Sequence, residues 1–256
     1  MKYLILNITV IIFISLSQTT FGEGDVNELS LFENSEQVKK FDAEVQRFIL
    51  ENPEIIIEAI KLYQQKKELE NLEAELQLLK SKSKELFEDD YSFVGGNKNG
   101  KIRVVEFIDY KCSYCKQNHE IIWNMLKGNS DVKFIVKEFP ILGPQSVLAA
   151  KALLAILIND THAIYKDFSD MLIKYEGPVN DAILRNFAKK VGSSIENLGS
   201  AMDSAQVNVI LAENAALAKS LGIQGTPSFV IENQIIRGFI SKNDFQKLIE
   251  LVRENL

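Results

Sequence analysis

The central part of the chain alternates short apolar runs with segments in which apolar side chains recur at helical spacing. Residues 101–110 (KIRVVEFIDY) are rich in β-branched and aromatic residues and follow the turn-forming sequence GGNKNG, which predicts a central strand. Residues 112–128 then carry apolar side chains at helical spacing and end on Gly128, a typical helix-terminating residue. Residues 131–139 (DVKFIVKEF) predict a further strand. The expected order is therefore strand, helix, strand.

Helical periodicity dominates the next part of the chain, after the sequence PILGP. We expect about four helices between residues 144 and 222, with breaks at Pro178, Gly192 and Gly222. These helices separate the strands before them from those that follow, and they are predicted to form an inserted helical domain.

The strand pattern returns near the C-terminus. Residues 228–231 predict a strand, Glu232 and Asn233 a turn, and residues 234–239 a second strand. A final helix is expected over residues 242–253. The chain thus ends on a hairpin and a helix.

The N-terminal part has a different pattern, in which a long polar helix is expected to start near Asn52, Pro53 and Glu54. Apolar residues fall on the a and d positions of a heptad frame that Gln65 and Ser83 interrupt. They are Leu62, Leu69, Leu72, Leu76, Leu79 and Leu86. The pattern favours a self-association stalk, and the alternative is a solvated helix that packs on its own domain.

The first 22 residues have the composition of a secretory signal peptide. Lys2 precedes an apolar run up to about Leu16, and a polar stretch then leads to Gly22, after which we expect cleavage. An uncleaved membrane anchor is the alternative, but Asn7 interrupts a run that is already short of the ~20 apolar residues a span needs. The mature protein is therefore expected in an extracytoplasmic compartment where disulfides can form.

Composition and charge narrow the classes of function. With 256 residues and 46% hydrophobic content, the chain can bury a full core without disulfide or metal staples. Its formal net charge is −6, and no basic block long enough to grip phosphates occurs, so nucleic acid is not an expected partner. The two cysteines are free for chemistry.

Those cysteines, Cys112 and Cys115, stand where the predicted strand gives way to the predicted helix. A disulfide between them closes too small a ring to restrict the unfolded chain much, so a structural staple is the weak hypothesis. The unpaired N–H groups of a helix start stabilise a thiolate, and Cys-X-X-Cys cysteines have pKa values of about 3.5–7.5. Cys112 is therefore expected to be the exposed nucleophile, and Cys115, one turn further on, the buried resolving thiol.

A metal site is an alternative for the same cysteines. Cys112, Cys115 and His119 share the i, i+3, i+7 spacing that places ligands on one helix face. No fourth ligand is evident, and the second histidine, His162, lies in the helical insertion. We therefore expect neither a dedicated metal site nor a cofactor.

The motifs VVEFIDYKCSYC, EFPILGPQSVLAAKA and LGIQGTPSFVI occur in this order, and with them the chain resembles the DsbA family of periplasmic thiol–disulfide oxidoreductases. The resemblance covers residues from about 90 to the C-terminus. It implies an α/β thioredoxin fold with an inserted helical domain at about 144–222. The expected domains are a signal peptide (1–22), an N-terminal helical extension (23–88) and the DsbA-like domain (89–256).

The resemblance also assigns residues around the cysteine pair. It implies that Pro227 is cis and lies against the sulfurs, so that the backbone of Thr226 can pair with an extended substrate chain. Glu106 matches the family's buried acid, which relays a proton to or from Cys115. A solvent-facing carboxylate is the alternative for Glu106, and Lys133 and Lys137 are its candidate charge partners.

Ser113 and Tyr114, expected with Thr226 at the substrate-binding surface, replace the Pro-His of the best-known members. Without that histidine beside the thiolate, Cys112 should be less acidic and the disulfide less oxidising. Some secreted relatives with an N-terminal extension self-associate and act as isomerases rather than oxidases, and a threonine before the cis proline is also a feature of isomerase-type proteins. The direction of exchange thus stays open between oxidation and isomerisation.

The expected function is a secreted, periplasmic protein disulfide oxidoreductase that forms or rearranges disulfides through Cys112 and Cys115. Its expected partners are secreted proteins with thiols or disulfides, a membrane redox partner, and further copies of the chain through the N-terminal helix. The alternatives are a holdase for unfolded secreted chains and, less favoured, a metal-handling protein that uses His119 with the cysteines.

Overall fold

The computed structural model describes residues 34–256, so the predicted signal peptide lies outside the described residues. By its contacts the chain divides into a small N-terminal unit that ends at Gln65 and a larger unit, Lys66–Leu256. In the described part of the chain, no helix is both long and apolar enough to cross a membrane.

The described part of the small unit is helical. Helix α1 (Ser35–Glu51) begins at Asn34, whose side-chain oxygen accepts hydrogen bonds from two backbone N–H groups, and none of its residues is buried. Helix α2 (Glu54–Ser81) starts after Pro53, as predicted, and continues into the larger unit. The separate helix α1 was not predicted. Most of its apolar residues, among them Val38, Val45 and Phe48, are exposed.

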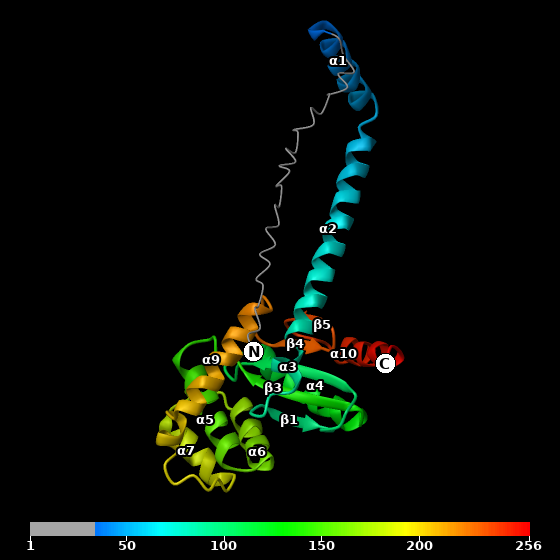
Figure 1. The fold of residues 1–256 in the computed structure, drawn as a ribbon. Coiled ribbons are helices and arrows are strands. Elements are labelled where there is room, and N and C mark those ends of the chain that lie inside the picture. The colour runs from blue at the N-terminus through cyan, green and yellow to red at the C-terminus, as the bar shows by residue number, and fades with distance from the viewer. Residues whose placement is uncertain (1–33) are drawn as a thin grey trace, which may run out of the picture. The chain divides into compact units, whose positions relative to one another are not determined.

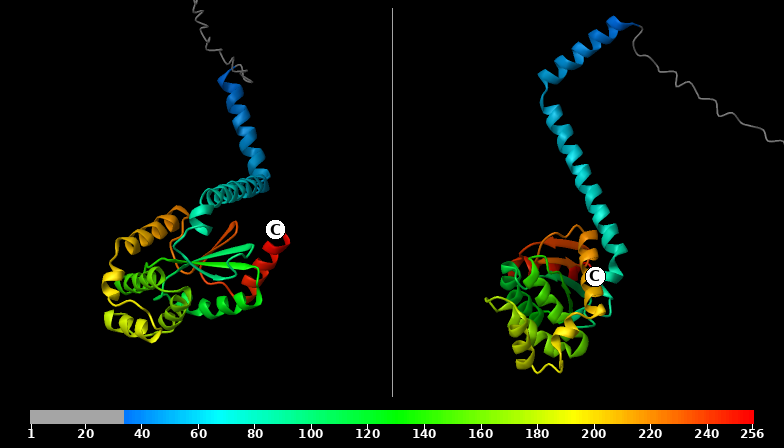
Figure 2. Two further views of the ribbon diagram at one scale, coloured as in Figure 1. Left: turned by 60° about the horizontal axis from the view of Figure 1, so that its bottom comes forward. Right: turned by 90° about the vertical axis from the view of Figure 1, so that its left-hand side faces the viewer.

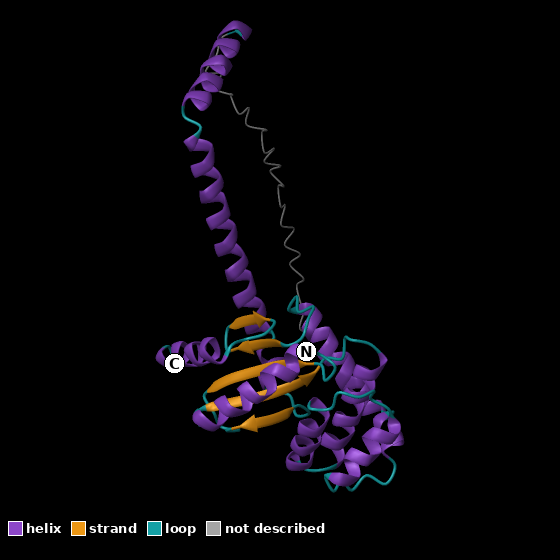
Figure 3. Cartoon of the chain, turned by 180° about the vertical axis from the view of Figure 1, so that it is seen from behind, coloured by secondary structure: helices purple, strands orange, loops and turns teal. Residues whose placement is uncertain are grey.

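A five-stranded mixed sheet forms the centre of the larger unit (Figure 3). The order is β1-β3-β2-β4-β5, in which β2 and β3 run parallel and the other neighbours pair antiparallel. The strands are β1 (Phe93–Gly96), β2 (Ile102–Ile108), β3 (Val132–Glu138), β4 (Ser228–Ile231) and β5 (Gln234–Arg237). The four strands predicted from the apolar runs are therefore confirmed.

Strand β1 was missed because its glycines resemble a turn. We expected GGNKNG to be a turn throughout, but Gly95 and Gly96 are the last residues of β1. A Cβ atom at Gly95 would lie 3.0 Å from the Trp123 ring, and one at Gly96, where φ is +65°, would lie 2.6 Å from the Val132 carbonyl oxygen. The close approach of neighbouring groups requires glycine here, so composition does not reveal the strand.

Helices cover both faces of the sheet (Figures 1 and 2). Helices α4 (Ser113–Gly128) and α10 (Lys242–Glu254) pack on one face, in one apolar cluster with Ile102, Val104 and Ile108 of β2. On the other face, Val105 and Phe107 of β2 contact the end of α2, α3 (Ser83–Phe87) and α9 (Ala205–Ser220). Alternate residues of β2 thus belong to different cores.

The insertion between β3 and β4 contains five helices, rather than the four or so that were predicted. They are α5 (Pro144–Asn159), α6 (His162–Ile173), α7 (Asp181–Lys190), α8 (Leu198–Met202) and α9. The extra boundary lies at Ser204, whose hydroxyl caps α9 by accepting a hydrogen bond from the Val207 N–H. Helix α6 contacts both β1 and α4, so the insertion reaches the neighbourhood of the cysteines.

The leucine pattern of the N-terminal helix divides into two groups. Leu79 and Leu86 are 3% and 0% exposed and belong to the core of the larger unit, so they do not form a self-association seam. Leu62, Leu69 and Leu72 are 60%, 62% and 54% exposed. These three remain available for contact with another chain.

A buried ion pair fixes the segment between α3 and β1. Lys137 of β3 is fully buried, and its Nζ binds the Asp89 carboxylate and the Ser92 hydroxyl oxygen. Burial lowers the pKa of Lys137, and the Asp89 charge opposes that shift. Asp89 also accepts hydrogen bonds from the Tyr91 and Ser92 N–H groups. The ion pair therefore holds this turn against β3.

We predict that Asp89→Asn destabilises the fold by about 3–5 kcal/mol, because it leaves the buried Lys137 charge unpaired while keeping the side-chain oxygen that caps the turn. Adding Lys137→Met should restore most of that loss. The exposed pair of Arg185 with Asp181 supplies the control, since Arg185→Ala should cost less than about 1 kcal/mol. Urea unfolding measures all three, and equal losses for Asp89→Asn with and without Lys137→Met would contradict the prediction.

Candidate functional site

The two cysteines lie at the junction between β2 and α4, as predicted. Cys112 is the N-cap residue of α4 with extended backbone (φ −76°, ψ 120°), and its carbonyl accepts the first hydrogen bond of the helix, from the Lys116 N–H at 3.1 Å. Cys115 lies one turn into the helix. The predicted helix start is confirmed.

Asp109 shapes this junction, and the sequence analysis missed it. It is 1% exposed, and its carbonyl accepts from the Cys112 N–H at 3.0 Å. One carboxylate oxygen accepts from the Lys111 N–H, and the other from the N–H groups of Ile141 and Leu142. The signal was an aspartate directly after an apolar strand, a residue that favours hydrogen bonds to the backbone two residues on.

Both thiols are free, and both are buried. Cys115 is 0% exposed, as predicted, but Cys112 is only 7% exposed, which corrects the expectation of an exposed nucleophile. The residue before Pro227 covers it, because the Cys112 thiol donates a hydrogen bond to the Thr226 carbonyl at 3.1 Å. That residue is distant in the sequence, so its cover could not be seen there.

The pKa of Cys112 is lowered from the usual 9.0 to about 5. A hydrogen bond from the Cys115 thiol contributes most, burial opposes it, and the Thr226 side chain and the backbone N–H groups of Cys115 and Tyr114 lower the pKa further. The buried Thr226 hydroxyl has no hydrogen-bond partner among the described residues while Cys112 is a thiol, so it is available to a thiolate. Cys112 is therefore ionised at neutral pH.

Cys115 has the opposite electrostatic environment. Burial raises the pKa of its thiol, the hydrogen bond with Cys112 raises it further, and so does the charge of Glu106. The two sulfurs thus differ in protonation at neutral pH. The Cys112 sulfur has thiolate character, whereas Cys115 keeps its proton.

Glu106 lies within the core, which favours the buried acid over the solvent-facing carboxylate. It is 3% exposed and shares a face of β2 with Val104 and Ile108, the face that α4 covers. One of its carboxyl oxygens, Oε1, has no hydrogen-bond partner among the described residues. Burial raises the pKa of Glu106 to about 8, and the Cys112 charge adds to the shift.

Neither proposed charge partner reaches Glu106. Lys137 binds Asp89, and the Lys133 Nζ donates to the Phe87 carbonyl at 2.7 Å. Both expectations were wrong because odd-numbered residues of β3 face the opposite side of the sheet from Glu106.

The loop before β4 completes the site. The Thr226–Pro227 peptide is cis, as the resemblance implies. Its surroundings are ordered by two hydrogen bonds, from the Ser228 hydroxyl to the Gly225 carbonyl at 2.7 Å and from the Gly238 N–H to the Pro227 carbonyl at 2.9 Å. The loop therefore presents Thr226 directly to Cys112.

The two residues between the cysteines face outward. Ser113 is exposed, and Tyr114 is 56% exposed with its ring 6.3 Å from that of Phe239, itself 43% exposed. Ile141 and Leu142, which bond Asp109 through their N–H groups, are also exposed. Apolar side chains thus lie on the segments that adjoin the cysteine pair.

His119 takes part in a contact within the protein. Its Nε2 lies 2.7 Å from a carboxylate oxygen of Asp170 in α6, and Lys166 binds the other oxygen. Within residues 34–256, no group of three or more His, Cys, Asp or Glu side chains could hold a metal ion. His119 therefore connects α4 to the insertion.

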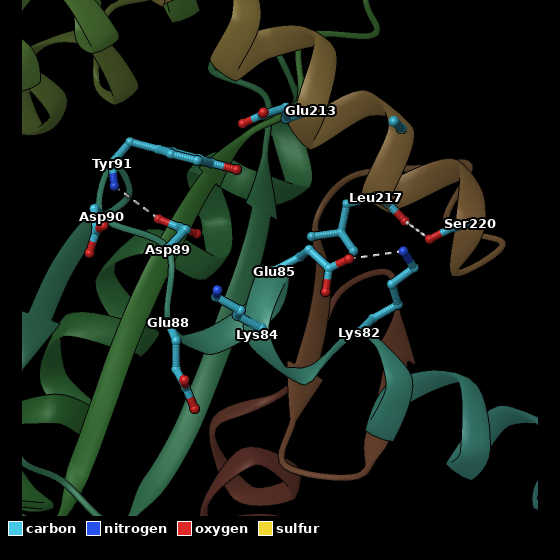
Figure 4. A pocket seen from close by; sticks show the side chains of 11 residues that line it. Lys82, Lys84, Glu85, Glu88, Asp89, Asp90, Tyr91, Glu213, Leu217 and Ser220 are labelled. Atoms are coloured by element: carbon cyan, nitrogen blue, oxygen red, sulfur yellow. Dashed lines mark hydrogen bonds and ion pairs between the residues drawn. The ribbon is translucent and has the colours of Figure 1, made fainter. Parts of the chain in front are cut away.

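A cavity of about 490 Å³ lies away from the cysteines, between α3, the segment that follows it, and α9 (Figure 4). Its lining includes Glu213, Leu217 and Tyr91, and Lys82 there pairs with Glu85 at 2.9 Å. Neither cysteine lines it, so the cavity is not part of the cysteine site.

Known proteins of similar sequence and fold agree with the sheet and the cysteine pair described above. A family model described as Thioredoxin matches residues 88–251. A thioredoxin-like oxidoreductase from Silicibacter pomeroyi DSS-3 is 33% identical, with 67% of this chain and 97% of that chain covered and a TM-score of 0.62. Proteus mirabilis ScsC in a transitional conformation is 28% identical, with 87% and 100% covered and a TM-score of 0.66.

Curated relatives are more distant. Disulfide bond formation protein D of Bacillus subtilis is 27% identical over 169 residues, which are 60% of this chain and 74% of that protein. The chain also matches a Na(+)/H(+) antiporter, NhaA 1 of Salinispora arenicola, at 23% identity over 147 residues, and spans only 22% of its length. The family model covers well over half of the chain, including the cysteine pair and the cis-proline loop. This chain belongs to the thioredoxin family.

Proposed function

We propose that the chain is an extracytoplasmic thiol–disulfide oxidoreductase that acts on protein substrates through Cys112 and Cys115. The observation that carries this proposal is the opposite shift of two neighbouring thiols, with the pKa of Cys112 lowered to about 5 and that of Cys115 raised. A structural pair of cysteines has no need of this asymmetry. The similarity to disulfide bond formation protein D supports the same activity.

The exchange proceeds in two steps when the reduced protein meets a substrate disulfide. The Cys112 thiolate attacks one substrate sulfur, which forms a mixed disulfide and releases the other substrate sulfur as a thiolate. Cys115 then attacks Cys112, so the Cys112–Cys115 bond forms and the substrate leaves with both sulfurs reduced. In the oxidising direction the same steps run backwards.

Glu106 is proposed as the base that takes the proton of Cys115 in the second step. In the reduced protein the Cys112 thiolate charge helps raise the pKa of Glu106. In the mixed disulfide that charge is gone, so the pKa of Glu106 falls and more of the carboxyl is ionised when Cys115 must lose its proton. The base therefore becomes available at the step that needs it.

Substrate contact is proposed for Thr226 and for the exposed residues between the cysteines. The Thr226 backbone adjoins the Cys112 sulfur, so an extended substrate chain can pair with it beside the reacting atoms. Tyr114 and Ser113 face solvent at the same point. The signal peptide predicted for residues 1–22 and the similarity to a periplasmic thioredoxin-like protein of Salmonella enterica support a periplasmic location and secreted substrates.

Self-association through the N-terminal helices is proposed as the feature that selects isomerisation. The exposed leucines of α2 supply apolar surface without a core of their own. Copies held together would present several Cys112 thiolates to one misfolded substrate at raised effective concentration. Repeated attack on wrong disulfides is what isomerisation requires. A membrane redox partner would return the pair to its working state.

The first prediction concerns which sulfur reacts. At about pH 6.5, iodoacetamide should label Cys112 of the reduced protein and spare Cys115, because only the former is a thiolate there. In Cys115→Ala the labelling of Cys112 should slow, since the largest cause of its low pKa is lost. Peptide mass spectrometry gives both rates, and equal labelling of the two wild-type cysteines would refute the assignment.

The second prediction concerns Glu106. Glu106→Gln should slow resolution of the mixed disulfide by about 10²-fold or more at neutral pH, in the range for loss of a general base, and the deficit should shrink at high pH. Glu120→Gln, an exposed change in α4, is the control and should match the wild type. Rapid-quench kinetics that start from the mixed disulfide between Cys112 and a substrate measure the rate at which the substrate is released. A rate equal to wild type at every pH would exclude Glu106.

The third prediction concerns the exposed leucines. Leu69→Asp with Leu72→Asp should dissociate an assembled protein, because each leucine buried between helices contributes about 1.5–3 kcal/mol. The variant should keep dithiol oxidation and lose most isomerase activity. Gln64→Asp with Asn71→Asp adds the same charge to α2 off the leucine stripe and should stay assembled. Light scattering reports the mass, and a wild-type monomer at micromolar concentration would remove the premise.

A further inference from the structure

A second buried acid lies beside Glu106, and the mechanism above does not use it. Glu138 is the last residue of β3 and is 1% exposed. In the parallel pairing of β2 with β3, Glu106 is opposite Val136 and Ile108 is opposite Glu138. Because side chains alternate along a strand, Glu138 faces the same side of the sheet as Glu106, one diagonal position away.

Hydrogen bonds fix Glu138 on one side only. Its Oε1 accepts from the Tyr165 hydroxyl at 2.7 Å, and its Oε2 has no partner among the described residues. The Tyr165 and Tyr110 hydroxyls also act on each other's pKa, and the Tyr110 hydroxyl shares a 2.9 Å hydrogen bond with Ser169. Tyr110 lies two residues before Cys112, so a buried polar network connects Glu138 to the start of the active-site turn.

Among the described residues, the side chains that shift the pKa of the two acids are all acidic or neutral. The side chains concerned come from four elements. They are Glu106 in β2, Asp109 and Tyr110 directly after it, Tyr165 in α6, Cys112 at the cap of α4 and Cys115 within α4. From α9, the Asn214 amide donates to the Glu138 backbone carbonyl at 3.1 Å. None of these groups is a cation, so ionising both glutamates at once is costly.

The titrations of the two carboxyls are therefore coupled. The pKa of each is raised to about 8, chiefly by burial; at Glu138 the hydrogen bond from Tyr165 opposes the shift, and the charges of Asp109 and Glu106 add to it. Coupling is reciprocal, so a charge on Glu138 raises the pKa of Glu106 by the same amount. The pair gives up its protons in two separate steps, and neither step belongs to one residue alone.

We propose that Glu138 is a positioning residue for the thiol–disulfide exchange, which keeps one proton on the Glu106–Glu138 pair and so sets the pH at which Glu106 accepts the proton of Cys115. The inference rests on the proposed function. In the step concerned, the Cys115 proton passes to the Glu106 carboxylate and the Cys115 sulfur bonds to Cys112. The bond between Cys112 and the substrate sulfur breaks, and the substrate leaves with that electron pair as a thiolate. Glu138 touches none of the reacting atoms.

The pH profile of mixed-disulfide resolution tests this role. In the wild type the profile should rise in two steps, whereas Glu138→Gln should show one step with a midpoint lower by about one pH unit, the coupling expected for interacting sites. Glu138→Asp keeps a carboxyl and should keep two steps. Ser169→Ala breaks the far end of the network without removing an acid and should also keep two. A Glu138→Gln profile equal to wild type would overturn the inference.

A second measurement does not depend on exchange. Carboxyl ¹³C NMR of the reduced wild type should show coupled titrations of Glu106 and Glu138. In Glu106→Gln and in Glu138→Gln, the remaining glutamate of the pair should titrate alone and at lower pH. Unchanged midpoints would overturn the coupling. Failure of the wild type to resolve any mixed disulfide would instead refute the proposed function, with the NMR titrations still deciding the coupling. If Glu138→Gln does not fold, Glu106→Gln decides it, because Glu138 should then titrate at lower pH.

Discussion

The site depends on one geometric constraint, which is that a parallel strand ends where a helix begins and a cysteine occupies the junction. As N-cap of α4, Cys112 lies next to backbone N–H groups that have no partner inside the helix. The next turn places Cys115 against the sheet, where water is absent. A single helical turn therefore separates a sulfur that is stabilised as an anion from one that is stabilised as a thiol. Asp109, buried beneath the turn, holds this junction in place through its backbone and side-chain hydrogen bonds.

The same arrangement has opposing effects on stability. The pKa of Cys112 falls from 9.0 to about 5 on folding, so its contribution to stability is fully present above 9.0 and is lost as pH falls through about 5. The pKa values of Glu106 and Glu138 rise from 4.5 to about 8, so their contribution is fully present below 4.5 and is lost as pH rises through about 8. Between about 5 and 8 the thiol and the two acids act against each other. Acids that are buried without a cation beside them are costly for stability and cluster at functional sites. Glu106 and Glu138 therefore indicate function here.

The helical insertion contributes directly to this region. Helix α6 supplies Tyr165 to Glu138, Ser169 to Tyr110 and Asp170 to His119. Phe93 of β1 stacks on Tyr165 with ring centroids 4.4 Å apart. The tyrosine is therefore held both by this ring contact and by its hydrogen bond to Glu138. The insertion thus supplies hydrogen-bond partners to Glu138, Tyr110 and His119, which lie on the segments around the cysteines.

By itself, the sequence determined the elements whose signals are local. The strands β2, β3, β4 and β5 and the start of α4 at the cysteine pair follow from apolar period, turn residues and helix-end signals. Tertiary structure alone decided what depends on neighbours distant in the chain. It buried Cys112 under Thr226, paired Lys137 with Asp89 instead of Glu106, and divided the leucines of α2 between a core and an exposed face. It also brought Glu138 to the side of Glu106, because sheet register, which no single segment encodes, sets which side chains share a face.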